Sequence, residues 1–402
     1  MRSRRARATV AAVAAVLASV LAVPAVTAVS QQPPPPAPEP ERPDIPPTVC
    51  LDREPETAAD YNAFFGGALG MWQAGDVPHR YPLPDGRVLW LTNDSFLSPL
   101  DPAGPLTAES GFVHNTAFVQ AGTCVTALAV LDADHDPQPF LKDPAPGHWY
   151  WPLGGVVQGD SLLVFLAELS APLPLSWALR LTARRTMIAT IDWRTLAVTN
   201  IEPAPDPGVA PFYGFSVVDD GTYTYLFGSN LIYGTNTATR LARVPSGRLG
   251  AAAYEYWTGS SWSASRSDAA PVHDPGGYSY ALQVSLVADR WYAVAKEDDF
   301  FGASIDILTA SEPTGPWRVG ATVRLPAKST AGQNTYDAGL IGELRAGGSV
   351  VMMWSNNNFD YAPVAADPSL YRPTFGDVQL PRDLLRHRTR AAFSPGPRVV
   401  AV

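Results

Sequence analysis

Cysteine is scarce in this sequence, since only Cys50 and Cys124 occur among 402 residues. Nucleophile and phosphate signatures are also missing: there is no Gly-x-Ser-x-Gly motif, no paired metal-binding histidines and no glycine-rich phosphate loop. Basic residues are outnumbered, with 29 Lys and Arg against 38 Asp and Glu, and the net charge is -9. We therefore expect no serine esterase, zinc hydrolase or phosphoryl-transfer chemistry, and no nucleic acid or anionic membrane as a partner.

The two cysteines could form a disulfide, bind a metal or supply a nucleophile. The chain begins with a secretory pattern, and in an exported protein two cysteines most often form one disulfide. We therefore expect a disulfide between Cys50 and Cys124 that ties the start of the folded domain to a strand about seventy residues later.

The N-terminus has the pattern of a secretory signal peptide. Arginines within the first seven residues precede an apolar run of Ala, Val and Leu from Thr9 to Val26, which ends in small residues. This order predicts a signal peptide over residues 1–28, cleaved after Ala28, and a protein that is secreted or associated with the cell envelope. An uncleaved membrane anchor is the alternative, because the run is just long enough to cross a bilayer.

The next segment, residues 29–49, is mostly proline with a few charges, which predicts an extended linker that buries no core. The folded domain should therefore cover residues 50–402. About 350 residues is more than most single hydrophobic cores hold. The length is compatible with two domains or with one domain built from repeats.

One supersecondary unit recurs five times after the linker. It consists of a short strand, a tight turn rich in Asp, Gly or Ala, and a second strand of β-forming residues, which is a hairpin pattern. The second strands start about 60 to 75 residues apart, and the intervals contain further strand candidates such as residues 187–191 and 305–309. The five hairpins cover residues 81–91, 155–166, 215–227, 284–295 and 340–354.

This recurrence predicts an all-β fold. Four-stranded sheets repeated around an axis make a β-propeller, so we expect five antiparallel blades in a ring. A β-sandwich with an accessory domain is the alternative, but the regular spacing of one hairpin type favours the ring. No long amphipathic helix pattern interrupts the strands; residues 383–388 could form one helical turn, and residues 398–402 could add a last strand.

In such a fold, the start of each first strand and the end of each second strand lie at the same end of the axis. The residues at these positions are mainly carboxylates, amides and aromatics. Aromatic faces stack on sugar C–H groups, amides and carboxylates bind hydroxyls, and paired carboxyls can cleave a glycosidic bond. We therefore expect an acidic, aromatic pocket for a polysaccharide, with no cofactor.

Four carboxylates at this rim are candidate catalytic residues. Glycosidase chemistry needs one carboxyl that is protonated and one that is ionised, in unlike surroundings. The simpler interpretation of any one of them is a loop carboxylate that caps a turn. The candidates are the leading pair Asp76 and Asp94, followed by Asp337 and Glu297.

Eight other rim residues are candidates for substrate binding. Two of them, Trp151 and Tyr213, could equally pack between blades, and His114 could be solvated or buried in the core. An acidic loop at 132–136 has the oxygen spacing of a calcium site but lacks its glycine and distal glutamate, so we expect no bound metal. The eight candidates are Trp149, Trp151, Tyr213, His114, Asn115, Gln283, Lys296 and Asn356.

Several short motifs together resemble a known family. They are Gly75-Asp76, Leu83-Pro84-Asp85-Gly86-Arg87, Leu89-Trp90-Leu91-Thr92-Asn93-Asp94, Val113-His114-Asn115, Tyr150-Trp151-Pro152, Tyr213-Gly214, Ala310-Ser311-Glu312-Pro313-Thr314-Gly315-Pro316-Trp317 and Tyr371-Arg372-Pro373. Spread over nearly the whole mature chain, they resemble the secreted actinobacterial propellers known as domain of unknown function 4185. Members of that group have been recognised as endo-D-arabinanases.

The resemblance implies that Asp76 and Asp94 stand where the family has catalytic aspartates. It implies a secreted glycoside hydrolase that cleaves a furanosyl polysaccharide from within the chain, with D-arabinan of the actinobacterial envelope as the expected substrate. We expect the protein to be a monomer. A non-catalytic glycan-binding propeller is the alternative; it would keep the aromatic residues but need no opposed carboxyls. A protein-interaction propeller would instead need a broad apolar face.

Overall fold

The computed structural model describes the folded part of the chain. Its described residues are 48–98, 101–107, 110–170, 181–229, 238–274, 278, 282–298 and 300–380, and they lie in one compact unit. The predicted signal peptide, nearly all of the predicted linker and the elements expected at 383–388 and 398–402 lie outside these residues. Within the described ranges, no helix has the length and apolarity that a membrane crossing requires.

All five predicted hairpins are present, and each belongs to a different antiparallel sheet. Their turns use residues suited to tight geometry; Gly86, for example, has a φ of 85°, which glycine adopts without strain. The hairpins are β3 (His79–Pro82) with β4 (Val88–Thr92), β11 (His148–Gln158) with β12 (Ser161–Ser170), β15 (Phe212–Asp219) with β16 (Tyr223–Ser229), β21 (Gln283–Val287) with β22 (Arg290–Lys296), and β25 (Gln333–Ile341) with β26 (Ser349–Asn358).

Further strands extend each sheet outward from its hairpin. The first sheet also includes β1 (Thr48–Cys50), which is close to the predicted start of the domain. The added strands are β7 (Thr116–Ala121) and β8 (Cys124–Leu128); β13 (Thr182–Asp192) and β14 (Val198–Pro203); β17 (Thr239–Pro245), β18 (Glu255–Trp257), β19 (Trp262–Ser263) and β20 (Pro271–His273); β23 (Ser304–Ala310) and β24 (Arg318–Arg324); and β27 (Thr374–Gln379). Five further short elements connect the sheets or their strands: β9 (Val130–Leu131), β10 (Pro137–Gln138), η2 (Arg266–Asp268), α2 (Tyr361–Ala366) and η3 (Pro368–Tyr371).

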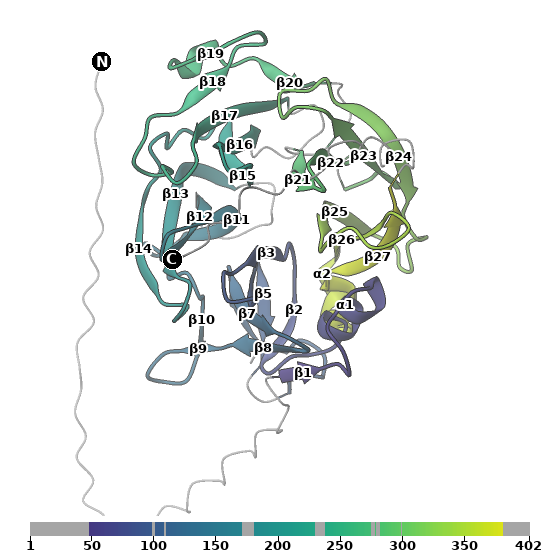
Figure 1. Ribbon diagram of the computed structural model, residues 1–402. Coiled ribbons are helices and arrows are strands. Elements are labelled where there is room, and N and C mark those ends of the chain that lie inside the picture. Colours follow the sequence, from purple (N-terminus) through teal and green to yellow (C-terminus); the bar gives the residue numbers. More distant parts are fainter. Residues whose placement is uncertain are drawn as a thin grey trace, which may run out of the picture. The chain divides into compact units, whose positions relative to one another are not determined.

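The sheets follow one another around a common centre in chain order (Figure 1). A separate hydrophobic core lies between each sheet and the next, and another joins the fifth sheet to the first. A β-sandwich has two sheets on one core, whereas here every sheet contributes to two cores, so the sandwich alternative is wrong. Residue pairs that belong to the five successive cores are Leu89 and Val164, Phe165 and Phe212, Phe227 and Trp291, Val294 and Val350, and Val351 and Trp90.

A short helix, α1 (Ala58–Phe65), covers the junction of the fifth and first sheets. Thr57 begins it with the reciprocal hydrogen bonds of a capping box. Phe65 then packs on Phe118 of the first sheet, at 5.5 Å between ring centroids, and on Phe375 of the fifth, at 5.8 Å. We did not predict this helix, because eight residues give too short an apolar pattern, although its capping box is visible in the sequence.

A small second sheet stands beside the first. It pairs β2 (Trp72–Gly75) with β5 (Ser95–Leu97), and β5 with β6 (Gly111–Val113). All four residues of β2 are buried. This small sheet positions the candidate site, because β2 leads directly into β3 and β4 leads directly into β5.

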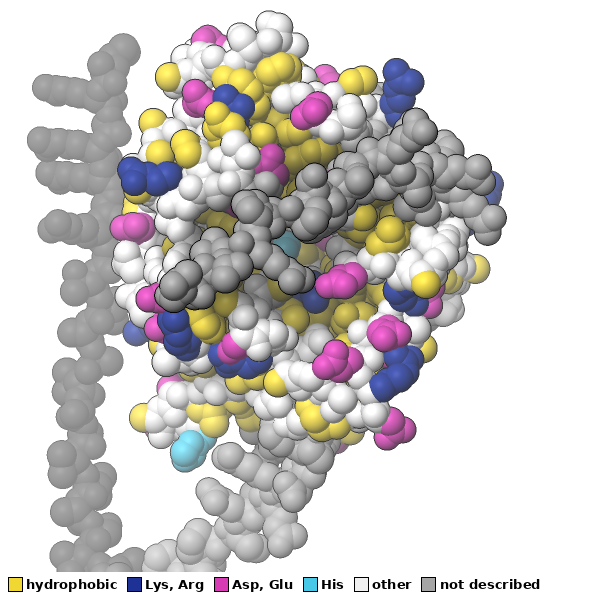
Figure 2. Space-filling view, in the orientation of Figure 1, with side chains coloured by type: hydrophobic (Ala, Val, Ile, Leu, Met, Phe, Trp, Pro, Cys, Tyr) yellow, Lys and Arg dark blue, Asp and Glu magenta, His cyan; other side chains and the backbone are white. Residues whose placement is uncertain are grey.

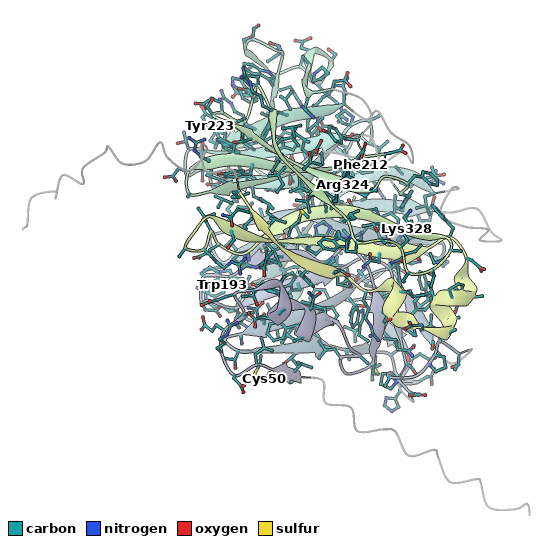
Figure 3. All side chains as sticks on the ribbon, turned by 90° about the vertical axis from the view of Figure 1, so that its right-hand side faces the viewer. Cys50, Trp193, Phe212, Tyr223, Arg324 and Lys328 are labelled. Carbon is teal, nitrogen blue, oxygen red and sulfur yellow. A yellow bond between two sulfur atoms is a disulfide. The ribbon has the colours of Figure 1, made fainter. Side chains whose placement is uncertain are left out.

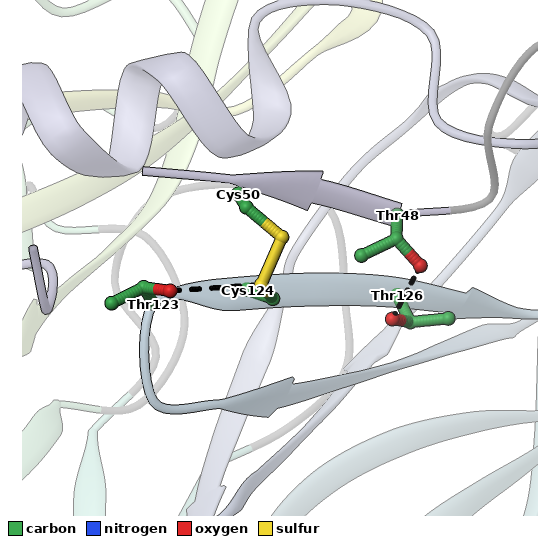
Figure 4. Close-up of a disulfide and its surroundings, with 5 residues drawn as sticks. All are labelled: Thr48, Cys50, Thr123, Cys124 and Thr126. Carbon is green, nitrogen blue, oxygen red and sulfur yellow. Dashed lines mark hydrogen bonds between the residues drawn. A yellow bond between two sulfur atoms is a disulfide. The ribbon is translucent and has the colours of Figure 1, made fainter. Parts of the chain in front are cut away.

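The predicted disulfide is confirmed. Cys50 of β1 and Cys124 of β8 lie directly opposite each other in the antiparallel register and are bonded through sulfur (Figure 4). In the same strand pair, the hydroxyls of Thr48 and Thr126 are hydrogen-bonded at 2.8 Å. The disulfide therefore fixes β1 to the outer edge of the first sheet.

Replacing both cysteines with serine should lower the free energy of unfolding by about 4 kcal/mol, because the bond closes a loop of 74 residues in the unfolded chain. Urea unfolding followed by tryptophan fluorescence measures this. Thr48→Val is the matched control, since it removes only the neighbouring hydrogen bond and should cost about 1 kcal/mol or less. Equal losses in the two variants would contradict the account.

Candidate active site

The predicted rim is one end of the ring of sheets. Antiparallel pairing brings the relevant strand ends together, with His148 opposite Ser170 in the second sheet and Phe212 opposite Ser229 in the third. In Figure 3, Phe212 at the start of β15 lies away from the edge at which Tyr223 begins β16. The start of a first strand and the end of a second strand therefore share a rim, as expected.

Two chain segments bend side by side at Asp76 and Asp94. The first connects β2 to β3 and the second connects β4 to β5. The Asp76 N–H donates to the Asp94 carbonyl at 3.2 Å, and the Asn93 N–H donates to the Asp76 carbonyl at 2.9 Å. Because these hydrogen bonds bridge the bend, both aspartates are anchored at the same point of the first sheet.

Val77, next to Asp76, has an unusual backbone conformation. Its φ is 45°, a region that β-branched residues rarely adopt and that costs about 1 to 3 kcal/mol. The side chain is buried, and the Val77 N–H donates to the Ser355 hydroxyl of β26 at 2.9 Å. The fifth sheet therefore holds the bend in place, and strained backbone of this kind is concentrated at functional sites.

Asp76 is buried, with 9% of its surface exposed. The Tyr336 hydroxyl of β25 donates to its Oδ2, and the Asn357 amide donates to the Tyr336 oxygen at 3.3 Å. Its Oδ1 is buried and has no hydrogen-bond partner among the described residues. Burial raises the pKa of Asp76 well above its ordinary value, and the nearby Asp94 charge raises it further. The hydroxyls of Tyr336 and Tyr371 only partly offset this rise, which favours the protonated acid.

Asp94 has different surroundings. Its Oδ1 accepts one hydrogen bond from the Trp151 indole at 2.7 Å and one involving His114 Nδ1 at 2.9 Å. Its side chain is 22% exposed. The Tyr371 hydroxyl donates to the Asp94 backbone carbonyl at 3.2 Å. The structure thus brings together three of the predicted site residues, Asp94, Trp151 and His114, from the first and second sheets.

His114 is held on two sides. Its ring stacks on Trp149, with 4.3 Å between centroids and 14° between planes, and it meets the edge of Phe112 at 5.1 Å. Trp149 itself is buried in the core between the second and third sheets. Trp149 therefore supports the imidazole and does not offer its own face to a sugar.

Asp143 is a third carboxylate close to this pair, and we did not identify it from the sequence. Burial raises its pKa, the Asp94 charge also raises it, and the charge of His114 lowers it. Its Oδ1 is buried and has no hydrogen-bond partner in the described part of the chain. The residue lies in the loop before β11, a few positions upstream of the rim residues that we collected.

The other two predicted carboxylates, Asp337 and Glu297, differ in how they relate to Asp76 and Asp94. Asp337 follows Tyr336 with a φ of 43°, and its charge raises the pKa of Asp76, which places it near the site. Glu297 is exposed and accepts a hydrogen bond from the Ser304 hydroxyl. Buried Lys296 donates to the carbonyls of Glu297 at 2.9 Å and Gly302 at 2.7 Å. Glu297 and Lys296 therefore have contacts that order their own loop.

Three predicted binding residues make hydrogen bonds that connect segments of the fold. Asn115 is fully buried; its amide donates to the carbonyls of Leu141 and Tyr150, at 3.2 and 3.1 Å. Gln283 accepts from the Ser216 hydroxyl at 3.3 Å, which joins the fourth sheet to the third. Asn356 is buried, and its amide donates to the Arg372 carbonyl at 2.9 Å and the Thr374 hydroxyl at 2.8 Å.

Tyr213 is fully buried in the core between the second and third sheets. Its ring is tilted against Tyr256 at 5.4 Å, and burial raises the pKa of its hydroxyl. The structure therefore gives Tyr213 the packing role that was the alternative to sugar binding.

The acidic loop at 132–136 is ordered by its own hydrogen bonds. Asp132 Oδ1 accepts from the N–H groups of Asp134 and Asp136, at 3.0 and 2.9 Å, and Gln138 donates to its other oxygen at 2.9 Å. Among the residues that the structure describes, no group of three or more His, Cys, Asp or Glu side chains is arranged to hold a metal ion.

Comparison with known proteins gives a family and a fold. The family model described as Domain of unknown function (DUF5005) matches residues 58–380. A search of curated proteins found no match. Among solved structures, the chain is similar to a Bacteroides ovatus ATCC 8483 protein provisionally named a hydrolase, with a TM-score of 0.66 and 18% identity over 88% of this chain and 100% of the other. A GH43_1 enzyme from Xanthomonas citri, solved with xylotriose, gives a TM-score of 0.45 and 13% identity over 80% of this chain and 92% of that enzyme.

Substituting Asp76 with Asn should make the protein more stable at pH 8. Because the folded-state pKa is raised, the stability that Asp76 contributes is complete below about pH 4 and is lost as the pH rises through the raised value. The neutral amide avoids this loss, by about 1.4 kcal/mol for each unit of pKa shift. Urea unfolding at pH 4 and pH 8 measures the difference.

The exposed turn residue Asp160 provides the control, and Asp160→Asn should show no such gain. The account would be contradicted if Asp76→Asn were less stable than the wild type at pH 8 by the same amount as at pH 4.

Proposed function

The chain belongs to the family described as domain of unknown function DUF5005, and from the unlike surroundings of Asp76 and Asp94 we propose that it is a glycoside hydrolase. The observation that carries the proposal is the pairing of a buried aspartate whose pKa is raised with a more exposed aspartate that accepts two hydrogen bonds, at one bend of the first sheet. Two carboxyls with divergent surroundings are the minimum that acid–base cleavage of a glycosidic bond requires.

Asp76 is the proposed acid. In its protonated form it gives its proton to the glycosidic oxygen as the bond between that oxygen and the anomeric carbon breaks, so the leaving sugar departs as an alcohol. Tyr336 donates to Oδ2 and is itself held by Asn357, which leaves Oδ1 to carry the proton. Asp337 adds negative charge nearby, which raises the pKa of Asp76 further.

Asp94 is the proposed partner. It either takes a proton from the water that attacks the anomeric carbon or attacks that carbon itself, in which case water later releases the sugar. Trp151 and His114 fix Oδ1 through their hydrogen bonds, and the stack on Trp149 fixes His114 in turn. Preorganised donors of this kind avoid reorganisation during the reaction.

The proposed substrate is a neutral furanosyl polysaccharide. The net charge of -9 disfavours an anionic chain, and on the face shown in Figure 2 the described Lys and Arg side chains are scattered among Asp and Glu side chains. The resemblance of the sequence motifs to domain of unknown function 4185 supports D-arabinan of the actinobacterial cell envelope, cleaved within the chain.

The architecture that we propose is a five-bladed β-propeller over residues 50–402, preceded by a signal peptide over 1–28 and a linker over 29–49. The hydrophobic core that joins the fifth sheet to the first supports the ring. The disulfide is consistent with a secreted protein. We propose that the mature protein is a monomer.

A non-catalytic glycan-binding protein is the competing function. That function would require neither a carboxyl kept protonated by burial nor a second carboxyl anchored beside it. The surroundings of Asp76 therefore favour the hydrolase.

Asp94→Asn should reduce hydrolysis by about 1000-fold or more, because the amide can neither activate water nor attack the anomeric carbon. The test incubates the full-length wild type and variant with arabinogalactan, lipoarabinomannan and a plant L-arabinan, and separates the released oligosaccharides by chromatography. Asp160→Asn is the control and should retain full activity, since Asp160 lies on an exposed turn. Retained binding without cleavage by the wild type would instead establish the glycan-binding alternative.

A further inference from the structure

The exposed aromatic side chains of the described chain gather near the candidate site. Four are strongly exposed: Phe301 (66%), Phe359 (49%), Phe112 (48%) and Tyr361 (43%). Phe112 lies on β6 and Phe301 in the loop between β22 and β23, while the other two stand after β26 and at the start of α2. Soluble proteins rarely leave such rings together in water unless a ligand or partner covers them.

One group of these rings is continuous with Asp94. Phe112 meets the edge of His114 at 5.1 Å, and His114 is hydrogen-bonded to Asp94. Phe96 lies 5.0 Å from Phe112 and 6.1 Å from Tyr361, measured between ring centroids. Rings in direct contact therefore run outward from this carboxylate to the surface.

A second group is continuous with Asp76. Tyr336, which donates to Asp76, packs at 5.1 Å on Phe300. Phe300 lies 6.0 Å from Phe359, which stacks on Phe301 at 5.4 Å and 25°. Phe359 is followed two residues later by Tyr361, so the two groups share one short segment of chain.

The chemistry of these rings restricts what can cover them. The six side chains carry no formal charge at neutral pH, and their flat faces suit the C–H faces of sugar rings better than aliphatic side chains would. A neutral chain also avoids repulsion from a protein of net charge -9. Because the rings reach beyond both carboxylates, one sugar unit at the site of cleavage would leave most of them uncovered.

We propose that these side chains form an aromatic rim that binds several successive sugar units of a neutral polysaccharide. The inference rests on the proposed function, because it takes the carboxylate pair as the point of cleavage. It follows that the protein prefers long chains and cuts within them, while a substrate confined to the carboxylates gains nothing from the rim. The aromatic rim consists of Phe96, Phe112, Phe300, Phe301, Phe359 and Tyr361.

The test removes the exposed rings in pairs from the full-length protein. One variant combines Phe112→Ala with Tyr361→Ala, and the other combines Phe301→Ala with Phe359→Ala. Val319→Ala is the matched control, because Val319 is 52% exposed and lies on the outer strand β24. Affinity for arabinogalactan is measured by electrophoresis through gels that contain it, and kcat/KM is measured with arabinogalactan and with an aryl α-D-arabinofuranoside.

Each paired variant should bind arabinogalactan about 10-fold more weakly, equivalent to about 1.4 kcal/mol. Its kcat/KM for the polysaccharide should fall to the same extent. For the variant that combines Phe301→Ala with Phe359→Ala, neither of which contacts His114, kcat/KM for the aryl glycoside should stay within about twofold of the wild type. A variant with Phe301→Tyr and Phe359→Tyr keeps both rings and should restore binding, which excludes misfolding as the cause.

The possible failures are distinguishable. If the wild type cleaves arabinogalactan and the paired variants do so equally well, the aromatic rim is overturned and the hydrolase stands. If the wild type binds without cleaving and the variants lose binding, the rim stands and the hydrolase fails. If the wild type neither binds nor cleaves the glycan, or if the variants lose affinity for a protein or for lipid vesicles instead, the sugar-binding rim is overturned.

Discussion

The burial of Asp76 depends on a contact between the two ends of the ring. Asp76 leaves the first sheet, and the hydroxyl that meets it belongs to Tyr336 of the fifth, 260 residues later in the chain. The same sheet supplies Ser355, which holds the strained backbone of Val77. Without the fifth sheet, Asp76 would lie in water with an ordinary acidity. The raised pKa of Asp76 thus depends on the packing of the last sheet on the first, which links ring closure to the proposed acid.

The side chain of Asp94, the second carboxylate, is oriented by residues outside the fifth sheet. Asp94 lies next to Asp76 in the backbone hydrogen bonding, yet its side chain is held by Trp151 of the second sheet and by His114. Three sheets therefore meet at one bend, and each supplies what the others lack: the first brings both carboxylates, the fifth buries one, and the second orients the other. This division explains how two chemically identical side chains, anchored at one point, come to have unlike surroundings.

Features set by local sequence could be predicted, and features set by packing could not. The five hairpins and the strand ends at the rim follow from turn residues and from the pattern of β-forming residues. The Cys50–Cys124 bond follows from the expectation that the chain is exported. The buried state of Tyr213 and the role of Trp149 depend on which side of a strand faces the neighbouring sheet, which the spacing of hairpins does not determine. Asp143 lies in an irregular loop with no pattern to reveal it, and only the folded structure shows its effect on the site.

The account rests on the raised pKa of Asp76, and carboxyl carbon NMR of protein labelled at aspartate measures it most directly. Spectra recorded from pH 3 to pH 9, with Asp76→Asn used to assign the signal, should contain one aspartate resonance that titrates well above the ordinary value near 4 and disappears in the variant. If every aspartate signal titrates below about pH 5, Asp76 is not held as an acid and the proposed mechanism is contradicted.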